Sequence, residues 1–171
     1  MSAAAHDRYE ATMTPAEYGD HYQEHLLDQY KLYVEMAYNI SARRADSNQF
    51  YVKVLAALLA IIALAAKLPL GNSNAQVQRI TNLAIIMLAL VLCVVWYVNI
   101  ESYRQLNSGK FAIIHEMEKT LPFPCYDAEW DQLKRGANSA TYRPLTHIER
   151  YVPIILAAPF LVHLGCLIAN W

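Results

Sequence analysis

The sequence predicts an all-α membrane protein with about three transmembrane helices and long cytoplasmic helical extensions. Three apolar stretches carry this prediction, at residues 54–66, 83–98 and 152–169. At about 1.5 Å per residue, the 18 residues of the last stretch form a helix of about 27 Å, close to the roughly 30 Å hydrocarbon core of a bilayer. The polar segments show helical periodicity and helix-capping signals, so they are expected to be ordered helices as well.

The composition narrows the function classes. Hydrophobic residues make up 56% of the 171 residues, and 14 Lys and Arg stand against 15 Asp and Glu. With no basic excess to neutralise a phosphate backbone, nucleic acid is not expected as a partner. Cys93, Cys125 and Cys166 show neither CxxC nor paired spacing, which predicts free thiols. No basic start leads into an apolar segment, so an internal span is expected to direct insertion.

Five segments are expected along the chain. Residues 1–13 are predicted to be disordered, and residues 14–49 to form a cytoplasmic amphipathic helix. Residues 50–100 are predicted to form a transmembrane helical hairpin, residues 101–150 a cytoplasmic helical region, and residues 151–171 the third transmembrane helix. The composition shifts at these boundaries from polar and charged to almost entirely apolar, or back.

Local signals set the helix ends. The first helix should begin at the capping box of Thr14 and Glu17, and the hairpin should turn at Pro69 and Gly71. The second span should continue as a helix to the prolines at 122 and 124, after which Asp127 should cap a short helix. A second capping box, Thr146 with Glu149, should lead into the third span, which Pro159 should kink.

Basic residues near the span ends predict the orientation. Nine lie on one side of the membrane: Arg43, Arg44, Lys53, Arg104, Lys110, Lys134, Arg135, Arg143 and Arg150. Only Lys67 and Arg79 lie on the other side. The positive-inside rule therefore places the N-terminus in the cytoplasm. Amphipathic side chains are expected as membrane-interface anchors on the cytoplasmic side, namely Lys53, Trp96, Tyr97 and Tyr151, with Trp171 at the opposite interface.

The helix over residues 26–40 is strongly amphipathic. Its apolar positions step by four, three, four and three residues, through Leu26, Tyr30, Tyr33, Ala37 and Ile40. Glu24, Asp28, Lys31 and Glu35 share the opposite arc, and this polar face is net acidic. Helices that lie on lipid usually have a Lys- and Arg-rich polar face, so a protein partner is favoured. We expect the apolar arc to form an oligomer contact between copies of the chain.

Two groups of residues have metal-ligand spacing. His21, Glu24 and His25 match the H-x-x-E-H spacing of some zinc peptidases, but they lie before the apolar stripe on a helix expected to be solvated. His115 and Glu118 stand on a helix beside Lys119, where charges usually form a solvated face. Neither group is interpreted as a site, and no metal or cofactor is expected.

His163 is the one ionisable side chain near the middle of a span. Ionisable groups are costly there and often functional, so it is a possible intramembrane polar site. The alternative is a neutral imidazole that only hydrogen-bonds another helix. No Ser-His-Asp signature, P-loop or GxGxxG motif occurs, and no acidic cluster lies within a span. An enzymatic activity is therefore not expected.

Several sequence blocks resemble the RipA-like family of small integral membrane proteins of bacteria. The blocks are HLLDQYKLYVEMA at residues 25–37, ISARR at 40–44, SYRQLNS at 102–108, YDAEW at 126–130 and YRPLTHIER at 142–150. The resemblance implies a multi-pass protein of the bacterial inner membrane that assembles as a homo-oligomer, an octamer by family usage. It implies no reaction, because that family offers no catalytic residues to carry over.

The overall plan is also similar to SLATT-type membrane effectors of bacterial defence systems, although those have two spans. Two functional hypotheses follow. The first is a homo-oligomeric scaffold or membrane-homeostasis protein without enzymatic activity, assembled through its cytoplasmic helices. The second is a regulated pore or channel-like effector, and an enzyme subunit is a weaker third class. The absence of charged residues from residues 54–66 and 83–98 speaks against a wide, permanently hydrated pore.

Overall fold

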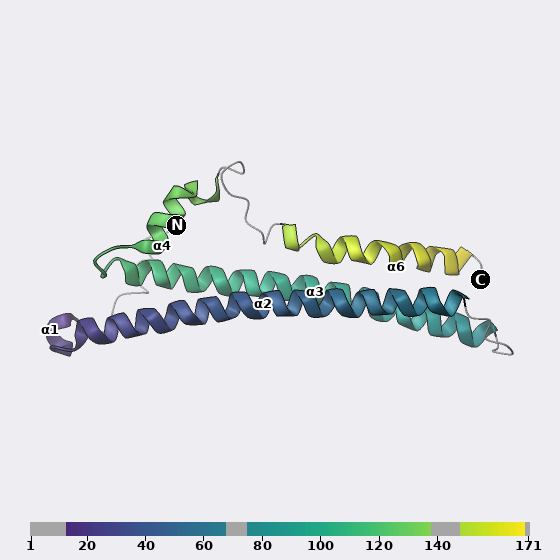
Figure 1. Cartoon of the computed structure of the whole chain (residues 1–171), viewed down its shortest axis with the longest axis horizontal. Helices are drawn as coiled ribbons and strands as arrows, with labels where there is room; N and C mark the ends of the chain where they lie inside the picture. Colours follow the sequence, from purple (N-terminus) through teal and green to yellow (C-terminus); the bar gives the residue numbers. More distant parts are fainter. Residues whose placement is uncertain (1–12, 68–74, 138–147, 170–171) are drawn as a thin grey trace. The chain divides into compact units, whose positions relative to one another are not determined.

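The computed structural model of the chain confirms the all-α class. It describes residues 13–67, 75–137 and 148–169, and these contain helices and turns but no strand (Figure 1). Three described helices are long and apolar enough to cross a membrane. The expected disordered N-terminus up to residue 12, the turn at Pro69 and Gly71, Thr146 of the second capping box, and the anchor Trp171 lie outside the described residues.

Two very long helices dominate the described residues. The elements are α1 (Pro15–Tyr18), α2 (Tyr22–Lys67), α3 (Ala75–Glu118), α4 (Cys125–Gln132), the 3-10 helix η2 (Lys134–Gly136) and α6 (Val152–Ala169). α2 has 46 residues and α3 has 44, so each joins an apolar span to a polar extension without interruption. This confirms the prediction of spans with long helical extensions.

The chain forms two compact units. The polar unit comprises Met1–Ala42 with Arg104–Arg143, and the span unit comprises Arg43–Tyr103 with Pro144–Trp171. Within each unit α2 and α3 run antiparallel. In the polar unit Tyr30 contacts Glu118 and the later Tyr33 contacts the earlier Lys110. In the span unit Ser47 contacts Asn99 and the later Asn48 contacts the earlier Trp96.

The N-terminal capping box forms as predicted, but the helix that it starts is short. The backbone N–H and the hydroxyl of Thr14 both donate to Glu17 Oε2 at 2.8 Å, which holds the pKa of Glu17 below its usual range. α1 ends after Tyr18, because Gly19 adopts φ of 91°, a backbone conformation that favours glycine. The prediction of one continuous helix from Thr14 was therefore wrong, and α2 begins only at Tyr22.

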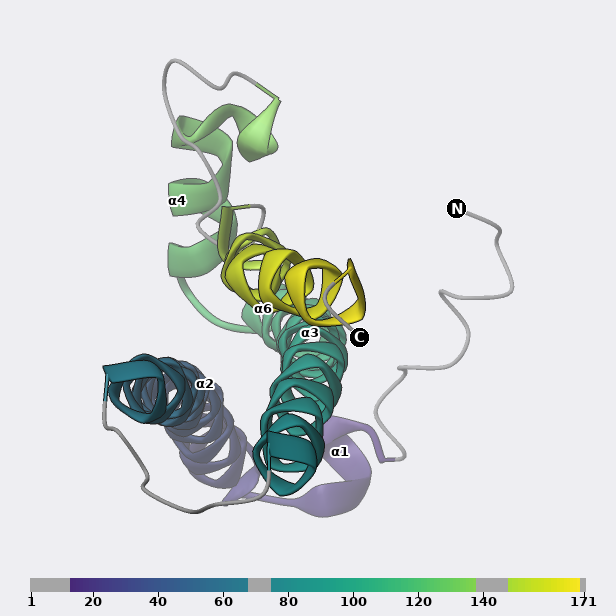
Figure 2. The same cartoon turned by 90° about the vertical axis from the view of Figure 1, so that its right-hand side faces the viewer.

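The span unit is held together by an apolar core. Leu55 of α2, Ile86 of α3 and Phe160 of α6 are fully buried in it. The core also contains Tyr51, Ile62, Ala89, Cys93, Trp96 and Ile100. α6 lies alongside α3, as the view along the helices shows (Figure 2). Lipid is as apolar as this core, so the three helices are held together by close van der Waals packing and by hydrogen bonds between helices rather than by exclusion of water.

The polar unit packs α2 and α3 against each other and adds α4. Ala37 and Ile114 are buried between the long helices. α4 begins at Cys125 with Pro124 at its N-cap, and Asp127 lies inside its first turn. The prediction of Asp127 as the capping residue was therefore wrong. The Arg135 guanidinium joins η2 to α4, because it lies 2.6 Å from Asp131 and 3.1 Å from Asp127, and this pairing raises the pKa of Arg135.

Candidate functional site

A buried carboxylate is the polar centre of the polar unit. Glu118, at the end of α3, is 1% exposed. Its Oε1 accepts hydrogen bonds from the Tyr30 hydroxyl at 3.0 Å and from the Tyr126 backbone N–H at 2.8 Å. Its Oε2 accepts from the Asp127 backbone N–H at 3.1 Å. One carboxylate thus connects α2, α3 and α4.

The chemistry of the α4 N-terminus explains why a charge is buried there. The first N–H groups of a helix have no partner within the helix, and Pro124 has no side-chain oxygen to offer them. Glu118 supplies the missing acceptor from another element, and its negative charge lies at the positive end of the helix dipole. Burial raises the pKa of Tyr30, and the hydrogen bond to Glu118 raises it further. Tyr30 therefore stays a neutral donor.

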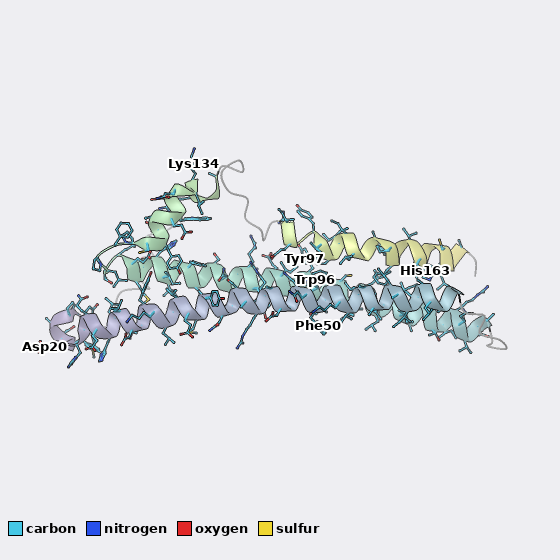
Figure 3. The ribbon with its side chains drawn as sticks, viewed as in Figure 1. Asp20, Phe50, Trp96, Tyr97, Lys134 and His163 are labelled. Atoms are coloured by element: carbon cyan, nitrogen blue, oxygen red, sulfur yellow. The ribbon has the colours of Figure 1, made fainter. Side chains whose placement is uncertain are left out.

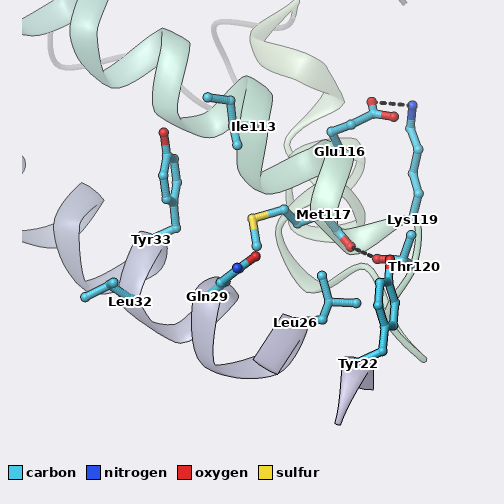
Figure 4. Close-up of a pocket in the computed structure, with 10 residues that line it drawn as sticks. All are labelled: Tyr22, Leu26, Gln29, Leu32, Tyr33, Ile113, Glu116, Met117, Lys119 and Thr120. Atoms are coloured by element: carbon cyan, nitrogen blue, oxygen red, sulfur yellow. Dashed lines mark hydrogen bonds and ion pairs between the residues drawn. The ribbon is translucent and has the colours of Figure 1, made fainter. Parts of the chain in front are cut away.

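A groove lies beside this junction, between α2 and α3 (Figure 4). It has a volume of about 560 Å³. One wall is formed by Tyr22, Leu26, Gln29, Leu32 and Tyr33 of α2, and the other by Ile113, Glu116 and Met117 of α3 with Lys119 and Thr120 of the turn that follows it. The charges of Glu116 and Lys119 pair with each other at 2.6 Å at one edge. The remaining lining is mostly apolar, so the groove suits a hydrocarbon side chain better than an ion.

The residues predicted to contact another subunit lie against α3 of their own chain. Tyr30 bonds to Glu118, the Tyr33 ring lies 4.6 Å from the Lys110 ammonium, and Ala37 is 4% exposed. Leu26 and Ile40 are partly buried. The intramolecular packing removes the premise that this arc needs a second copy to cover it. An oligomer contact at these five residues stays a prediction.

Polar side chains continue the buried stripe of α2 into the span unit. Asn48 Oδ1 accepts from Trp96 Nε1, and Ser47 Oγ accepts from Asn99 Nδ2, both at 2.8 Å. One turn earlier in α2, Arg44 Nε lies 3.6 Å from Glu149 Oε2, which is an ion pair slightly longer than a hydrogen bond. The two hydrogen bonds between α2 and α3 are part-buried and would be lost if one helix slid along the other, so they specify the register of α2 on α3.

The four predicted membrane anchors differ in how exposed they are. Lys53, Tyr97 and Tyr151 are exposed, and their role as anchors stays a prediction. Trp96, which is labelled in Figure 3, is 2% exposed, and it stacks on the Tyr51 ring with ring centroids 5.6 Å apart. A side chain that contacts headgroups must be accessible, so the prediction for Trp96 was wrong. Its indole instead packs between the helices, because it stacks on Tyr51 and donates a hydrogen bond to Asn48, both on α2.

His163 lies in α6 (Figure 3). Its Nε2 is buried and has no hydrogen-bond partner among the described residues. The expected hydrogen bond to another helix is therefore not seen at this nitrogen. Both roles considered for His163, packing and ion handling, stay open.

The first candidate metal group, His21 with Glu24 and His25, lies at the start of α2 on its exposed side. His21 and His25 stack with ring centroids 5.8 Å apart, and His21 Nδ1 lies 3.2 Å from Glu24 Oε2. His25 Nδ1 is joined to the Tyr18 hydroxyl at 2.8 Å. These side chains are exposed, as predicted for a solvated helix. Within residues 13–67, 75–137 and 148–169, no group of three or more His, Cys, Asp or Glu side chains is arranged to hold a metal ion.

A comparison with family models gives one match. The model described as the octameric membrane protein family, 8xMP, matches residues 27–169, which is 143 of the 171 residues. The chain belongs to this family. The match confirms the predicted resemblance to a family of small octameric membrane proteins. Neither the curated proteins nor the solved structures contain a match.

The 8xMP match includes all three spans and both walls of the α2–α3 groove from Leu27 onward. It also includes Glu118, which sequence reasoning assigned to a solvated face. That prediction was wrong. Two signals pointed to burial: Glu118 lies four residues after Ile114 on the buried stripe of α3, and a proline precedes α4 where a capping side chain would be expected.

Proposed function

We propose that this 8xMP chain forms a homo-octamer in the bacterial inner membrane and acts there as a scaffold or membrane-homeostasis protein without enzymatic activity. The family description supports the octamer, and the match over 143 residues covers the spans and the polar unit together. The nine-to-two distribution of basic residues supports a cytoplasmic location of the polar unit.

One observation carries the choice of a scaffold over a pore. Residues 54–66 and 83–98 contain no charged side chain. The spans expose many large apolar side chains: Val52, Ile61, Leu64, Met87, Leu88, Val91, Val94, Val95, Val98, Ile154, Ile155, Leu161, Val162 and Ile168. Whichever of these faces met at the centre of a ring would present hydrocarbon to the axis. A conducting path needs polar or charged groups that replace the hydration shell of an ion. The faces of these spans suit lipid and other spans instead.

Two measurements on the purified full-length protein test the proposal. Native mass spectrometry in mild detergent should give about 155 kDa, the mass of eight 19.4 kDa chains, rather than the mass of one. In liposomes loaded with an ion-sensitive dye, the same preparation should leave the leak rate unchanged from empty liposomes. A monomeric mass contradicts the octamer. Ion flux that scales with the amount of protein contradicts the scaffold and supports the pore-forming alternative.

A further inference from the structure

The polar unit exposes large apolar side chains on two different faces of α2. Tyr38 is 73% exposed and Leu27 is 42% exposed, and with the partly buried Val34 they recur at seven and four residues. This spacing places them on one side of the helix, and we call them the ridge. Leu32, which is 58% exposed, lies on the groove side. Positions five residues apart on a helix are about 140° apart, so ridge and groove face different directions.

A ring of identical subunits requires two different surfaces on each copy. In a closed cyclic assembly the contact is heterologous, since one patch of each subunit meets another patch of the next. A two-fold dimer would need a single self-complementary patch instead. The polar unit offers one concave apolar surface, the groove, and one convex apolar surface, the ridge. Soluble surfaces rarely leave such side chains grouped without a partner.

The depth of the two surfaces also agrees. Copies inserted with one orientation are related by rotation about the membrane normal, and this rotation keeps every atom at the same depth. Contacting residues must therefore come from similar positions along the hairpin. The groove uses residues 22–33 of α2, and Leu27 of the ridge lies within this range. At 1.5 Å per residue, Leu27 and Gln29 differ in depth by only about 3 Å along the helix axis.

From these observations we infer that the groove of each subunit holds the Leu27 side of α2 from the next subunit. The inference rests on the proposed homo-octamer and names its contact surface. It also moves the subunit contact from the Tyr30 face, which packs on α3 of its own chain, to the two flanks of the same helix. The occupant is a second copy of this chain, because the description of the matching family is of an octameric membrane protein, and a ring of identical subunits brings the ridge of one copy to the groove of the next.

Disulfide cross-linking in membranes tests this contact. In a Cys125→Ser background, Leu27→Cys and Gln29→Cys are combined in one chain, and the membranes are treated with copper-phenanthroline. The two thiols point to opposite sides of one helix, so they cannot pair within a chain. Oxidation should produce a ladder of covalent species from dimer to octamer on a non-reducing gel. Each single variant should give no ladder, and the matched control Leu27→Cys with Asp28→Cys, on the charged face, should give none either.

A charge pair provides a second test that does not depend on thiol chemistry. Leu27→Lys alone should shift the native mass from octamer to smaller species, and adding Gln29→Glu should restore the octamer. An octamer that forms no ladder, and that Leu27→Lys leaves intact, overturns the inference while the proposed assembly stands. Dimers from Leu27→Cys alone also overturn it, because they indicate a two-fold contact. Absence of any oligomer in the unmodified chain is the separate failure of the proposed function.

Discussion

At the residue scale, Glu118 shows how a charged side chain becomes part of a core. An isolated buried carboxylate would cost several kcal/mol, but three donors from Tyr30, Tyr126 and Asp127 compensate this one. Charge alone predicted a solvated position for Glu118. The residues that make burial possible come from α2 and α4, far away in the sequence, so no local pattern could identify all of them.

Removing the Tyr30 hydroxyl should loosen α4. Tyr30→Phe deletes one of three hydrogen bonds to a buried carboxylate, and we expect a loss of about 1–2 kcal/mol in the stability of the polar unit. That corresponds to roughly 5- to 30-fold faster hydrogen exchange of the α4 amides, which mass spectrometry can measure. Tyr33→Phe is the matched control, because Tyr33 contributes its ring face to Lys110. Equal exchange in both variants would contradict the role of the hydroxyl.

The stability lost in Tyr30→Phe should depend on pH in a defined direction. The folded state raises the pKa of Tyr30 above its ordinary value near 10, so the folded state holds this proton more tightly than the unfolded chain. Its contribution is therefore fully present below about pH 10 and is lost as the pH rises through the folded value. The difference between the wild type and Tyr30→Phe should be constant from pH 6 to 9 and should shrink above pH 10.

At the element scale, the 3–4 spacing of apolar residues predicted the buried face of α2 but not its partner. Leu26, Tyr30, Tyr33, Ala37 and Ile40 do turn to one side, and α3 covers that side. Periodicity shows which residues are covered, and it carries no information on whether the cover belongs to the same chain. The break at Gly19 was missed for another reason. Glycine is tolerated within helices, and only its φ of 91° reveals the end of α1.

Close approach of α2 and α3 at Ala37 should be sensitive to side-chain volume. Ala37→Leu adds three carbon atoms where the side chain is 4% exposed, so we expect a destabilisation of about 1–3 kcal/mol from overpacking. Thermal unfolding in mild detergent, followed by circular dichroism, measures the effect. The control is Ala42→Leu at an exposed position of the same helix, which should change little. A neutral Ala37→Leu would contradict tight packing of the two helices at this position.

At the scale of the whole molecule, hydropathy predicted all three spans, because each must present about 20 apolar residues to lipid. The division into a polar unit and a span unit was less visible, since α2 and α3 cross from one to the other as continuous helices. The sequence separates these units only by composition. Where the composition changes, polar residues replace apolar ones on the inner face of the helices. Asn48 bonds to Trp96, Ser47 bonds to Asn99, and Arg44 pairs with Glu149.

Membrane topology gives the last prediction. Reporters fused near residue 10 or at residue 137 should read cytoplasmic, and a reporter after residue 72 should read extracytoplasmic. The physical reason is that nine basic residues near the span ends favour the cytoplasmic side and two remain on the other. Paired alkaline phosphatase and green fluorescent protein fusions measure this, because the first is active outside the cytoplasm and the second fluoresces inside it.

The fusion at residue 137 tests whether the α2–α3 hairpin crosses the membrane twice, and a further fusion tests whether α6 crosses. With α2, α3 and α6 all crossing the membrane, the α3–α6 connection must lie on the same side as the N-terminus. If α6 did not cross, the reporters at residues 10, 72 and 137 would be unaffected, so a fourth fusion after residue 169 is needed, and it should read extracytoplasmic. A cytoplasmic reading there would reduce the protein to two spans. An extracytoplasmic reading at residue 137 would show that the α2–α3 hairpin itself does not cross twice.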